Sequence, residues 1–355
     1  MRAYLYLEDG SIFEGSHFGA EVETDGEVVF STGMTGYEQS LTDPSFAGQI
    51  LVFTFPLIGN YGVPKPILRD KHLMENFESE KIWVQGVVVG DVTHRPSHYQ
   101  SNGSFDSWLQ KNSIPGITGI DTRALTQKLR ESGTLRGKIS LKKKNPIWTT
   151  SQINWVQRAS IKTPIRYKAD KDLTNGKTIA VIDCGVKHGI LRALLNRGFG
   201  IIRIPWNLNP LSLKEKFDGV LCSNGPGDPK NCAETVTNIQ SVLAAKVPFL
   251  GICLGHQLFA LASGADTFKL PYGHRGLNQP CQDVFTKQAY LTSQNHGYAV
   301  KRVSIPESCE EWFISLNDDT NEGLRSKTQK AWSIQFHPEG EPGPFDTDWI
   351  FEVLK

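Results

Sequence analysis

The sequence predicts an α/β protein, with a β-rich mixed N-terminal domain followed by a domain built on a doubly wound, mainly parallel sheet. Short β-branched and aromatic runs, separated by turn residues, fill most of the first half. In the second half, short apolar runs alternate with segments whose apolar residues recur at helical spacing, which is typical of parallel strands joined by helices. A chain of 355 residues can also form two domains, each with a substantial core.

The first half begins with a hairpin signal, because residues 4–13 alternate around a Glu-Asp-Gly turn. Residues 50–55 and 82–89 are apolar runs rich in β-branched and aromatic residues, as expected of strands. A helix should begin after Asp121, whose carboxylate can cap it, and end at Gly133.

A basic run at residues 142–146 ends this pattern. A solvated connector accounts for such a run better than an anion-binding site does. We therefore predict an N-terminal domain at residues 1–145, a loosely structured linker at 146–176, and a second domain at 177–355.

The second half alternates strand and helix signals. Residues 188–196, for example, place several leucine and isoleucine side chains on one helical face. In a parallel sheet of this kind, ligands bind at the carboxyl ends of the strands. We expect strands at 178–183, 200–204, 219–222 and 247–252, helices at 188–196, 233–245 and 254–264, and a closing helix at 345–354.

Composition argues against several classes of function. The net charge is +1 and no long block carries one sign, so neither nucleic acid nor a membrane surface is an expected partner. No apolar run approaches the roughly 20 residues of a membrane span, and the N-terminus lacks the apolar stretch of a signal peptide. The six cysteines contain no CxxC pair, so we expect neither disulfides nor a metal site. We expect a soluble, reduced, cytoplasmic protein.

Cys253 is the strongest candidate for a nucleophile. It lies between the apolar run 247–252 and a helical segment that begins at Leu254, and Gly251 and Gly255 are its small neighbours. At such a sharp strand–helix turn a nucleophile stands above the sheet, and a helix N-terminus lowers the pKa of a thiol. For this motif alone, the alternative is an unreactive core cysteine.

A nucleophilic thiol needs a base and a group that orients the base. His337 follows the alternating run 331–336, and residues two apart in an extended chain point to the same side. Glu339 can therefore reach the imidazole of His337, fix its tautomer and stabilise its protonated form. A surface histidine near a turn is the alternative. His256 should point away from the thiol and serve packing or hydrogen bonding.

The loop at residues 223–229 follows a predicted strand and contains two glycines around a proline. Glycines at a strand end let the backbone approach a ligand and present N–H groups to it. Gly225 and Leu254, the residue after the candidate nucleophile, could donate two N–H groups to an oxyanion. An ordinary turn would use the same residues.

Three motifs, at residues 223–229, 251–257 and 336–339, together resemble the class I, triad-type glutamine amidotransferases in residues, spacing and order. The first half narrows this resemblance to the small subunit of carbamoyl phosphate synthetase, and the resemblance extends over almost the whole chain. The motifs that narrow it lie at residues 31–37, 42–45, 56–62, 119–125 and 181–188.

The resemblance implies a glutaminase that delivers ammonia to a separate large synthetase subunit, in a heterodimer or an oligomer of heterodimers. That partner would use ATP, Mg and bicarbonate to make carbamoyl phosphate for arginine and pyrimidine synthesis, so no cofactor is expected in this chain. Cys253 would be the nucleophile, His337 the base and Glu339 the group that orients it. The residues implied to bind glutamine are Ser45, Gly225, Gly227, Leu254, Gln257, Asn295, Gly297 and Tyr298.

The sequence departs from the family pattern at four positions, none of them in the expected triad. Tyr298 replaces a common Phe, Gln279 a common His, Gly340 a common Ala, and Cys184 an aromatic residue. Three other functions stay open: a γ-glutamyl peptidase on the same fold, an amidotransferase subunit for another acceptor, and an inactive docking subunit. The first-half motifs argue against another acceptor, and the intact triad argues against an inactive subunit.

Overall fold

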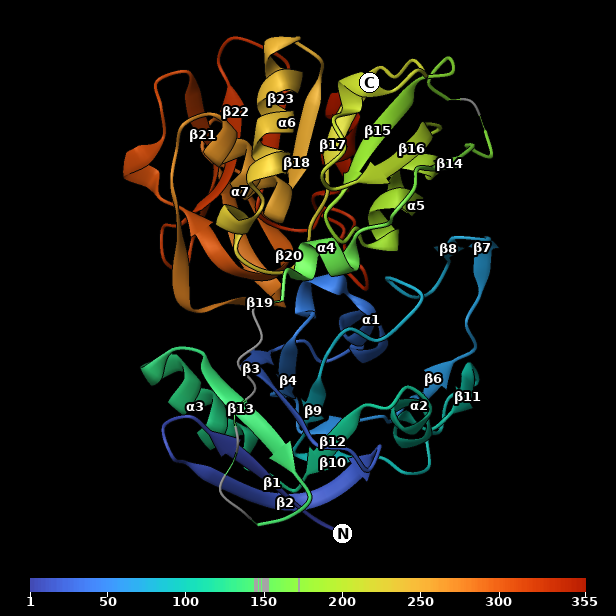
Figure 1. The fold of residues 1–355 in the computed structure, drawn as a ribbon, viewed down its shortest axis with the longest axis vertical. Helices are drawn as coiled ribbons and strands as arrows, with labels where there is room; N and C mark the ends of the chain where they lie inside the picture. The colour runs from blue at the N-terminus through green and yellow to red at the C-terminus, as the bar shows by residue number, and fades with distance from the viewer. Residues whose placement is uncertain (144–145, 147, 149–152, 172) are drawn as a thin grey trace. The chain divides into compact units, whose positions relative to one another are not determined.

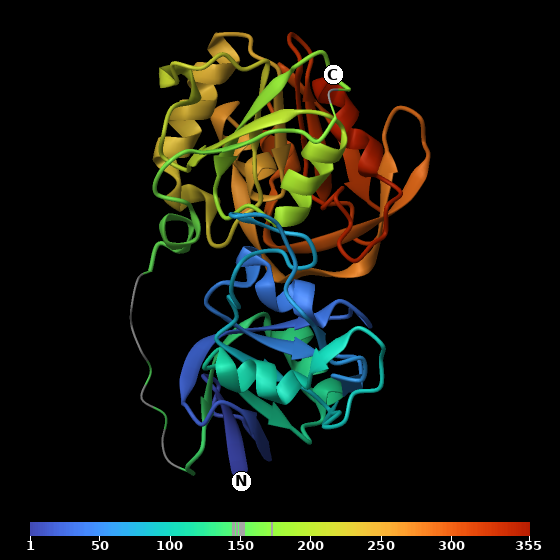
Figure 2. The same cartoon turned by 90° about the vertical axis from the view of Figure 1, so that its right-hand side faces the viewer.

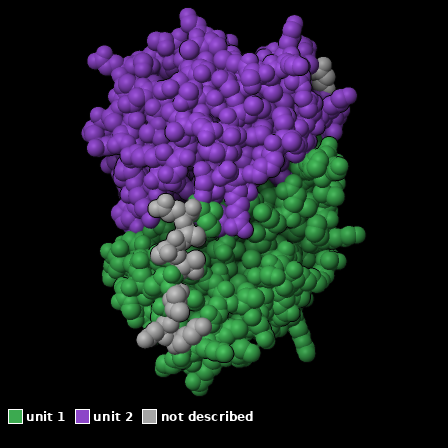
Figure 3. Space-filling model, in the orientation of Figure 1, with its two compact units in different colours: residues 1–153 green, residues 154–355 purple. Residues whose placement is uncertain are grey.

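In the computed structural model the chain forms two compact units, residues 1–153 and residues 154–355 (Figure 3). Each unit contains its own cluster of buried apolar side chains. None of the described helices is both long and apolar enough to cross a membrane. The structure describes residues 1–143, 146, 148, 153–171 and 173–355.

The first unit is a closed β-barrel with the strand order β1-β13-β3-β4-β9-β12-β2 (Figure 1). Strand β1 (Arg2–Leu7) closes the barrel because it pairs antiparallel with both β2 (Ile12–Gly19) and β13 (Leu135–Ser140). Closure leaves the barrel without an edge strand. Its other strands are β3 (Thr24–Ser31), β4 (Gln49–Phe53), β9 (Gly86–Val88) and β12 (Pro115–Thr118).

The predicted helix of this unit is α3 (Thr122–Ser132). The Asp121 carboxylate caps it by accepting a hydrogen bond from Ala124 N at 2.9 Å, and the helix ends at Gly133. The smaller elements of the unit are α1 (Tyr37–Thr42), the 3-10 turn η1 (Pro44–Phe46), α2 (Phe105–Lys111) and three two-stranded sheets, which pair β5 (Leu57–Ile58) with β10 (Asp91–Val92), β6 (Val63–Pro64) with β11 (Ser101–Gly103), and β7 (Leu68–Asp70) with β8 (Leu73–Met74).

The second unit is built on a ten-stranded sheet with the order β14-β16-β15-β17-β18-β23-β22-β20-β19-β21. The strands from β16 to β23 run parallel, and those on either side of them pair antiparallel. Every residue of β17 and β18 is buried, which is why these parallel strands read as apolar runs. The strands are β14 (Ile165–Tyr167), β15 (Thr178–Asp183), β16 (Gly200–Pro205), β17 (Gly219–Cys222), β18 (Phe249–Ile252), β19 (Thr267–Asp283), β20 (Ala289–Val300), β21 (Cys309–Ser315), β22 (Asn321–Ser326) and β23 (Ala331–Ile334).

Helices cover both faces of the parallel strands, as predicted for a doubly wound sheet. The chain runs from β15 through α5 (His188–Asn196) to β16 on one side, and from β17 through α6 (Ala233–Ala244) to β18 on the other side. Right-handed crossovers in opposite directions place the two helices on opposite faces, and Figure 2 shows strands between them. Helix α7 (Leu254–Ala262) follows β18 and packs against α6. The shorter helices are α4 (Trp155–Ala159), η2 (Pro210–Ser212), η3 (Pro229–Asn231), η4 (Arg302–Ser304) and η5 (Asp348–Leu354).

Part of the expected linker at 146–176 is structured. Helix α4 begins after Asn154, whose side chain accepts a hydrogen bond from Gln157 N at 2.9 Å, and β14 pairs antiparallel with β16. The sequence does not reveal β14 because a three-residue edge strand carries almost no periodicity. The predicted domain bounds, 1–145 and 177–355, stay predictions. Within the expected linker, residues 147, 149–152 and 172 lie outside the described residues.

The closing helix predicted at 345–354 is shorter and of the 3-10 type. Thr347, which precedes it, makes no side-chain cap, whereas Ile350, Phe351 and Leu354 are buried. Packing of these side chains, rather than local capping, therefore holds η5 in place.

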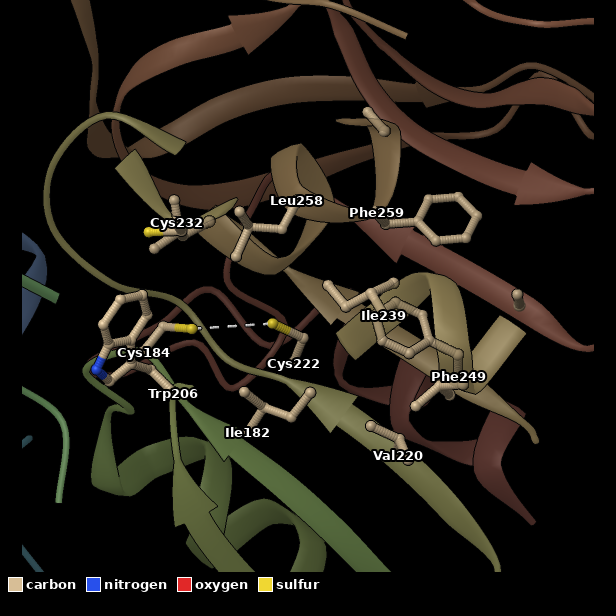
Figure 4. Close-up of a cluster of buried hydrophobic side chains, with 14 of the residues drawn as sticks. Ile182, Cys184, Trp206, Val220, Cys222, Cys232, Ile239, Phe249, Leu258 and Phe259 are labelled. Carbon is tan, nitrogen blue, oxygen red and sulfur yellow. Dashed lines mark hydrogen bonds between the residues drawn. The ribbon is translucent and has the colours of Figure 1, made fainter. Parts of the chain in front are cut away.

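A core of apolar side chains lies along β15, β17, β18 and α7 (Figure 4). The rings of Phe249 and Phe259 stack with centroids 5.6 Å apart. The thiols of Cys184 and Cys222 lie 4.0 Å apart in the same core. Each of these cysteines lies at or just beyond the carboxyl end of its strand, so this core supports the loops that form the candidate site.

Candidate active site

Cys253 lies at a sharp turn between β18 and α7. Its backbone has φ 53° and ψ −102°, a strained conformation for a residue with a side chain. Backbone hydrogen bonds enforce the turn, because Cys253 N donates to Ile334 O of β23 at 2.8 Å and Gln257 N donates to Cys253 O at 3.2 Å. The turn therefore has the geometry of a strand–nucleophile–helix elbow.

Glycines on both sides of Cys253 allow the chain to pack this closely. A Cβ on Gly255 would lie 2.1 Å from Cys222 O, and a Cβ on Gly251 would lie 2.5 Å from Gly255 O. Gly255 N also donates to Ser223 O at 3.1 Å. The first turn of α7 thus rests directly on the carboxyl end of β17, which brings the loop after β17 next to the elbow.

His337 and Glu339 form a buried pair just beyond β23. His337 Nδ1 donates to Glu339 Oε1 at 2.7 Å, and each side chain is only 1% exposed. His337 N donates to Ser293 O of β20 at 2.9 Å, which fixes the position of this turn. Because Nδ1 is engaged with the carboxylate, Nε2 is the nitrogen that can exchange a proton with another group.

The side chain of Cys253 lies beside this imidazole. Burial alone would lower the pKa of His337, but the Glu339 carboxylate and the neighbouring Cys253 outweigh burial and raise it to about 10. The thiol is close enough to affect the pKa of the ring but forms no hydrogen bond with it. Among the described residues, His337 Nε2 has no hydrogen-bond partner, and Cys253 Sγ lies 3.8 Å from Asn295 O. The structure thus brings together a thiol, an imidazole and a carboxylate.

Lys187 is a member of the site that the sequence analysis did not identify. Its Nζ lies 2.9 Å from Glu339 Oε1, and its side chain is 4% exposed. Burial would raise the pKa of Glu339, but Lys187 and His337 together hold it well below its usual range. One signal could have pointed to this lysine, since it lies between a predicted parallel strand and the helix that follows it, where such sheets place functional side chains.

Gly225 and Leu254 lie together beside the elbow. A Cβ on Gly225 would lie 2.9 Å from Leu254 Cδ2 and 2.2 Å from Cys184 O, so no larger residue fits there. Ser223 anchors this loop, because its Oγ accepts a hydrogen bond from Cys184 N at 3.0 Å. The backbones of Gly225 and Leu254 can therefore approach one bound group, and their role as oxyanion donors stays a prediction.

Most of the predicted glutamine contacts in the second unit gather around β20. Gln257 Nε2 donates to Tyr298 O at 2.8 Å and to Gln335 Oε1 at 3.0 Å. The Asn295 carbonyl oxygen lies 3.8 Å from Cys253 Sγ, and Gly297 and Tyr298 are half-buried. The segment is thus tied to α7, and its contacts with glutamine stay predictions.

Two predicted contacts lie elsewhere. Gly227 is exposed in the loop after β17 and has φ 90°, a conformation that favours glycine. Ser45 belongs to the first unit, in η1, where its N donates to Asp43 Oδ1 at 2.8 Å. The contribution of Ser45, and of the first domain, to a glutamine site stays a prediction.

His256 is held away from proton-transfer chemistry. Its Nδ1 lies 2.9 Å from Ser333 Oγ, and its side chain is completely buried. Burial lowers the pKa of His256 to about 3, so the ring is neutral. The side chain therefore packs α7 against β23.

Comparison with known proteins covers both units. The family model of the carbamoyl-phosphate synthase small chain, CPSase domain, matches residues 5–139, and that of the class-I glutamine amidotransferases matches residues 180–355. The carbamoyl phosphate synthase arginine-specific small chain of Neurospora crassa is 45% identical over 360 residues, which cover 99% of this chain and 78% of that protein. The carbamoyl phosphate synthase small chain of Pyrococcus furiosus is 43% identical over 365 residues, or 99% of this chain and 96% of that protein. The chain therefore belongs to the family of carbamoyl phosphate synthase small chains, with a class I glutamine amidotransferase domain in its second half.

Proposed function

We propose that this chain is the glutaminase subunit of a glutamine-dependent carbamoyl phosphate synthase, and that Cys253, His337 and Glu339 are its catalytic residues. The observation that carries the proposal is the buried His337–Glu339 pair at 2.7 Å, with Cys253 on the strained elbow beside it. A structural cysteine would not need a strained backbone, nor a neighbouring imidazole that a carboxylate orients. The arginine-specific small chain among the relatives favours a role in arginine synthesis, and pyrimidine synthesis is a second outlet that we propose for the same product.

The chemistry begins with attack of Cys253 Sγ on the side-chain amide carbon of glutamine. The raised pKa of His337 favours the imidazolium, so the ring can hold the thiol proton while the sulfur attacks. As the carbonyl oxygen becomes an oxyanion, N–H groups of Gly225 and Leu254 would stabilise it. The C–N bond then breaks, and the proton on His337 passes to the departing ammonia.

A γ-glutamyl thioester on Cys253 remains, and water resolves it. His337 Nε2 removes a proton from the water, whose oxygen forms the new bond to the acyl carbon as the C–S bond breaks. Glutamate leaves, and the proton returns to the sulfur or stays on the imidazole. Lys187 stabilises the charged form of Glu339 through the whole cycle, since its Nζ is 2.9 Å from the carboxylate.

The product ammonia explains why a partner is part of the proposal. In neutral water ammonia is mostly protonated and is then no longer a nucleophile. We propose that a large synthase chain receives it and uses ATP, Mg and bicarbonate to make carbamoyl phosphate, in a heterodimer or an oligomer of heterodimers. We further propose that the first domain docks this partner, that glutamine hydrolysis needs no cofactor bound to this chain, and that the complex works in the cytoplasm.

Trapping of the thioester tests the proposal. The full chain is mixed with glutamine labelled in its carbon skeleton, quenched in acid and digested, and the labelled peptide is identified by mass spectrometry. We expect label on the peptide that contains Cys253 and none in Cys253→Ser. Label on another cysteine, or glutamine hydrolysis that persists in Cys253→Ser, would contradict the assignment of the nucleophile.

A further inference from the structure

Four polar side chains meet in the interior of the antiparallel part of the second unit, apart from the candidate triad. His274 lies on β19, Gln294 and His296 lie on β20, and Glu322 lies on β22. They are 9%, 3%, 5% and 0% exposed, respectively. The nearest ligating atoms of the two imidazoles and the carboxylate all lie within 4.8 Å of one another. Buried polar side-chain atoms nearly always have at least one hydrogen-bond or metal partner.

Three of the six distances among these four ligand atoms match the edges of a tetrahedral metal site, and those that join His296 to His274 and to Glu322 are at most 4.8 Å. Gln294 Oε1 lies 3.1 Å from His274 Nδ1 and 3.1 Å from His296 Nε2. His274 Nδ1 lies 3.5 Å from Glu322 Oε1. Four ligands held about 2.0–2.1 Å from a zinc ion are about 3.3 Å from one another. All three of these separations are within a few tenths of an ångström of that value.

The outer nitrogen of each imidazole is already held by an acceptor. His274 Nε2 donates to Asp318 Oδ2 at 2.8 Å, and His296 Nδ1 donates to Tyr298 O at 2.8 Å. A neutral ring that donates from one nitrogen presents a lone pair on the other. His296 is such a ring, because burial lowers its pKa. Burial would also lower the pKa of His274, but Asp318 and Glu322 raise it to about 10, so an ion would have to displace the proton on its Nδ1. A carboxylate or carbonyl behind the ring is the arrangement that orients metal-ligating histidines.

Without a cation, this arrangement contains a conflict. Because burial lowers the pKa of His296, its ring is neutral and has a single N–H, which the Tyr298 carbonyl accepts. Its Nε2 lone pair then faces the lone pairs of Gln294 Oε1 at 3.1 Å, and two acceptors at that distance repel each other. A cation between the two atoms would replace this repulsion with coordination, and the carboxylates of Glu322 and Asp318 would balance a double positive charge.

We propose that His274, Gln294, His296 and Glu322 bind one Zn²⁺ ion in a closed, structural site. Two imidazoles with oxygen ligands suit zinc, and four protein ligands leave no open position for catalysis. The ion would cross-link β19, β20 and β22, and two of its ligands, Gln294 and His296, flank Asn295 on β20. Zinc would enter as the strands come together in folding, because the ligands are buried in the finished fold. This inference departs from the expectation of no metal site, since ligands from three separate strands form no short motif in the sequence.

A hydrogen-bond network without metal is the competing arrangement. If the Gln294 amide were turned over, its NH2 group would donate to both imidazoles, and a protonated Glu322 would donate to its carbonyl oxygen. The two arrangements predict opposite effects of Gln294→Glu. A carboxylate at position 294 would strengthen a zinc site, but it would remove both donors from the network.

The test uses the full chain, with Zn²⁺ and Co²⁺ as probes. We expect protein produced with added zinc to retain one equivalent after gel filtration in chelator, and protein produced with Co²⁺ to show tetrahedral d–d absorption without thiolate charge-transfer bands. Glu322→Ala should lose the metal, and Gln294→Glu should retain it with an equal or higher Tm. His98→Asn, which alters an exposed histidine of the first unit, is the matched control and should retain it as well.

Three results would overturn the proposal. Protein folded with zinc could contain only a small fraction of an equivalent, or Co²⁺ could show thiolate bands that identify cysteine ligands. A lower Tm for Gln294→Glu that zinc does not restore would favour the metal-free network. The last measurement decides the question even if Glu322→Ala fails to fold.

Discussion

Replacing Gly255 by alanine tests the elbow at the point where two backbones meet. A Cβ at this position would lie 2.1 Å from Cys222 O and 2.8 Å from Cys222 C. Since Cβ atoms essentially never lie within 3.0 Å of such backbone atoms, α7 and the end of β17 would have to separate by about 0.9 Å, the difference between 3.0 and 2.1 Å. Backbone atoms on both sides of this contact cannot yield as a flexible side chain would.

The size of the effect follows from that displacement. Overpacking of a well-packed interior costs about 1–3 kcal/mol, and a unit of roughly 200 residues loses about 2–4 °C of Tm for each kcal/mol. Gly255→Ala should therefore lower Tm by about 2–12 °C. Activity should suffer more, because Cys253 and Leu254 move with the first turn of α7. A misplacement of about 1 Å in reacting groups lowers kcat/KM by about 10²-fold.

Thermal melting and glutamate release from glutamine measure the two effects. Gly103→Ala in the first unit is the matched control, since the added Cβ would lie 3.4 Å from Ser107 Oγ, an ordinary contact. The control should keep both Tm and kcat/KM. If Gly255→Ala also keeps both, the close contact between α7 and β17 does not position the nucleophile, and the reasoning is refuted.

Three further predictions concern the candidate nucleophile, the carboxylate that orients its base, and a buried ion pair of the second unit. Cys253→Ser should abolish glutamine hydrolysis while synthesis from added ammonia by the complex continues; loss of both would indicate a broken assembly instead. Glu339→Gln removes the carboxylate that raises the pKa of His337, so this pKa should fall and the acidic limb of the pH–rate profile should move to lower pH. We also expect kcat/KM to drop by about 10²–10⁴-fold. An acidic limb at unchanged pH would show that Glu339 does not affect the pKa of His337. The buried guanidinium of Arg203 lies 2.9 Å from the Asp183 carboxylate, and Asp183→Asn removes this counter-charge. The variant should lower the free energy of unfolding, measured by denaturant titration, by about 3–5 kcal/mol. A loss below about 1 kcal/mol would mean that water reaches this pair.

The local features of the second half were the most predictable. Strand β15 and helix α5 have the bounds that the sequence predicts, because an apolar run and a 3.6-residue periodicity are properties of neighbouring residues. The elbow around Cys253 was recognisable for the same reason, since strand, glycines and helix follow one another directly. Asp121 and Gly133 likewise delimit α3 as predicted.

Contacts between residues far apart in the chain could not be predicted from the sequence. Barrel closure depends on pairing between β1 and β13, which come from opposite ends of the first unit. Lys187 meets Glu339 only because β15 and the turn after β23 lie at the same edge of the sheet. Gly340 has φ 58°, and a Cβ there would lie 2.2 Å from Pro344 O, a contact that no local pattern reveals.

The most direct test of the central claim is glutamate release from glutamine by the full chain, measured with and without the large synthase chain, ATP and bicarbonate. We expect slow hydrolysis by the chain alone and a sharp increase in the complete mixture, with Cys253→Ser inactive in both. Fast hydrolysis that is indifferent to the partner would contradict the subunit role, and no hydrolysis under any condition would contradict the glutaminase itself.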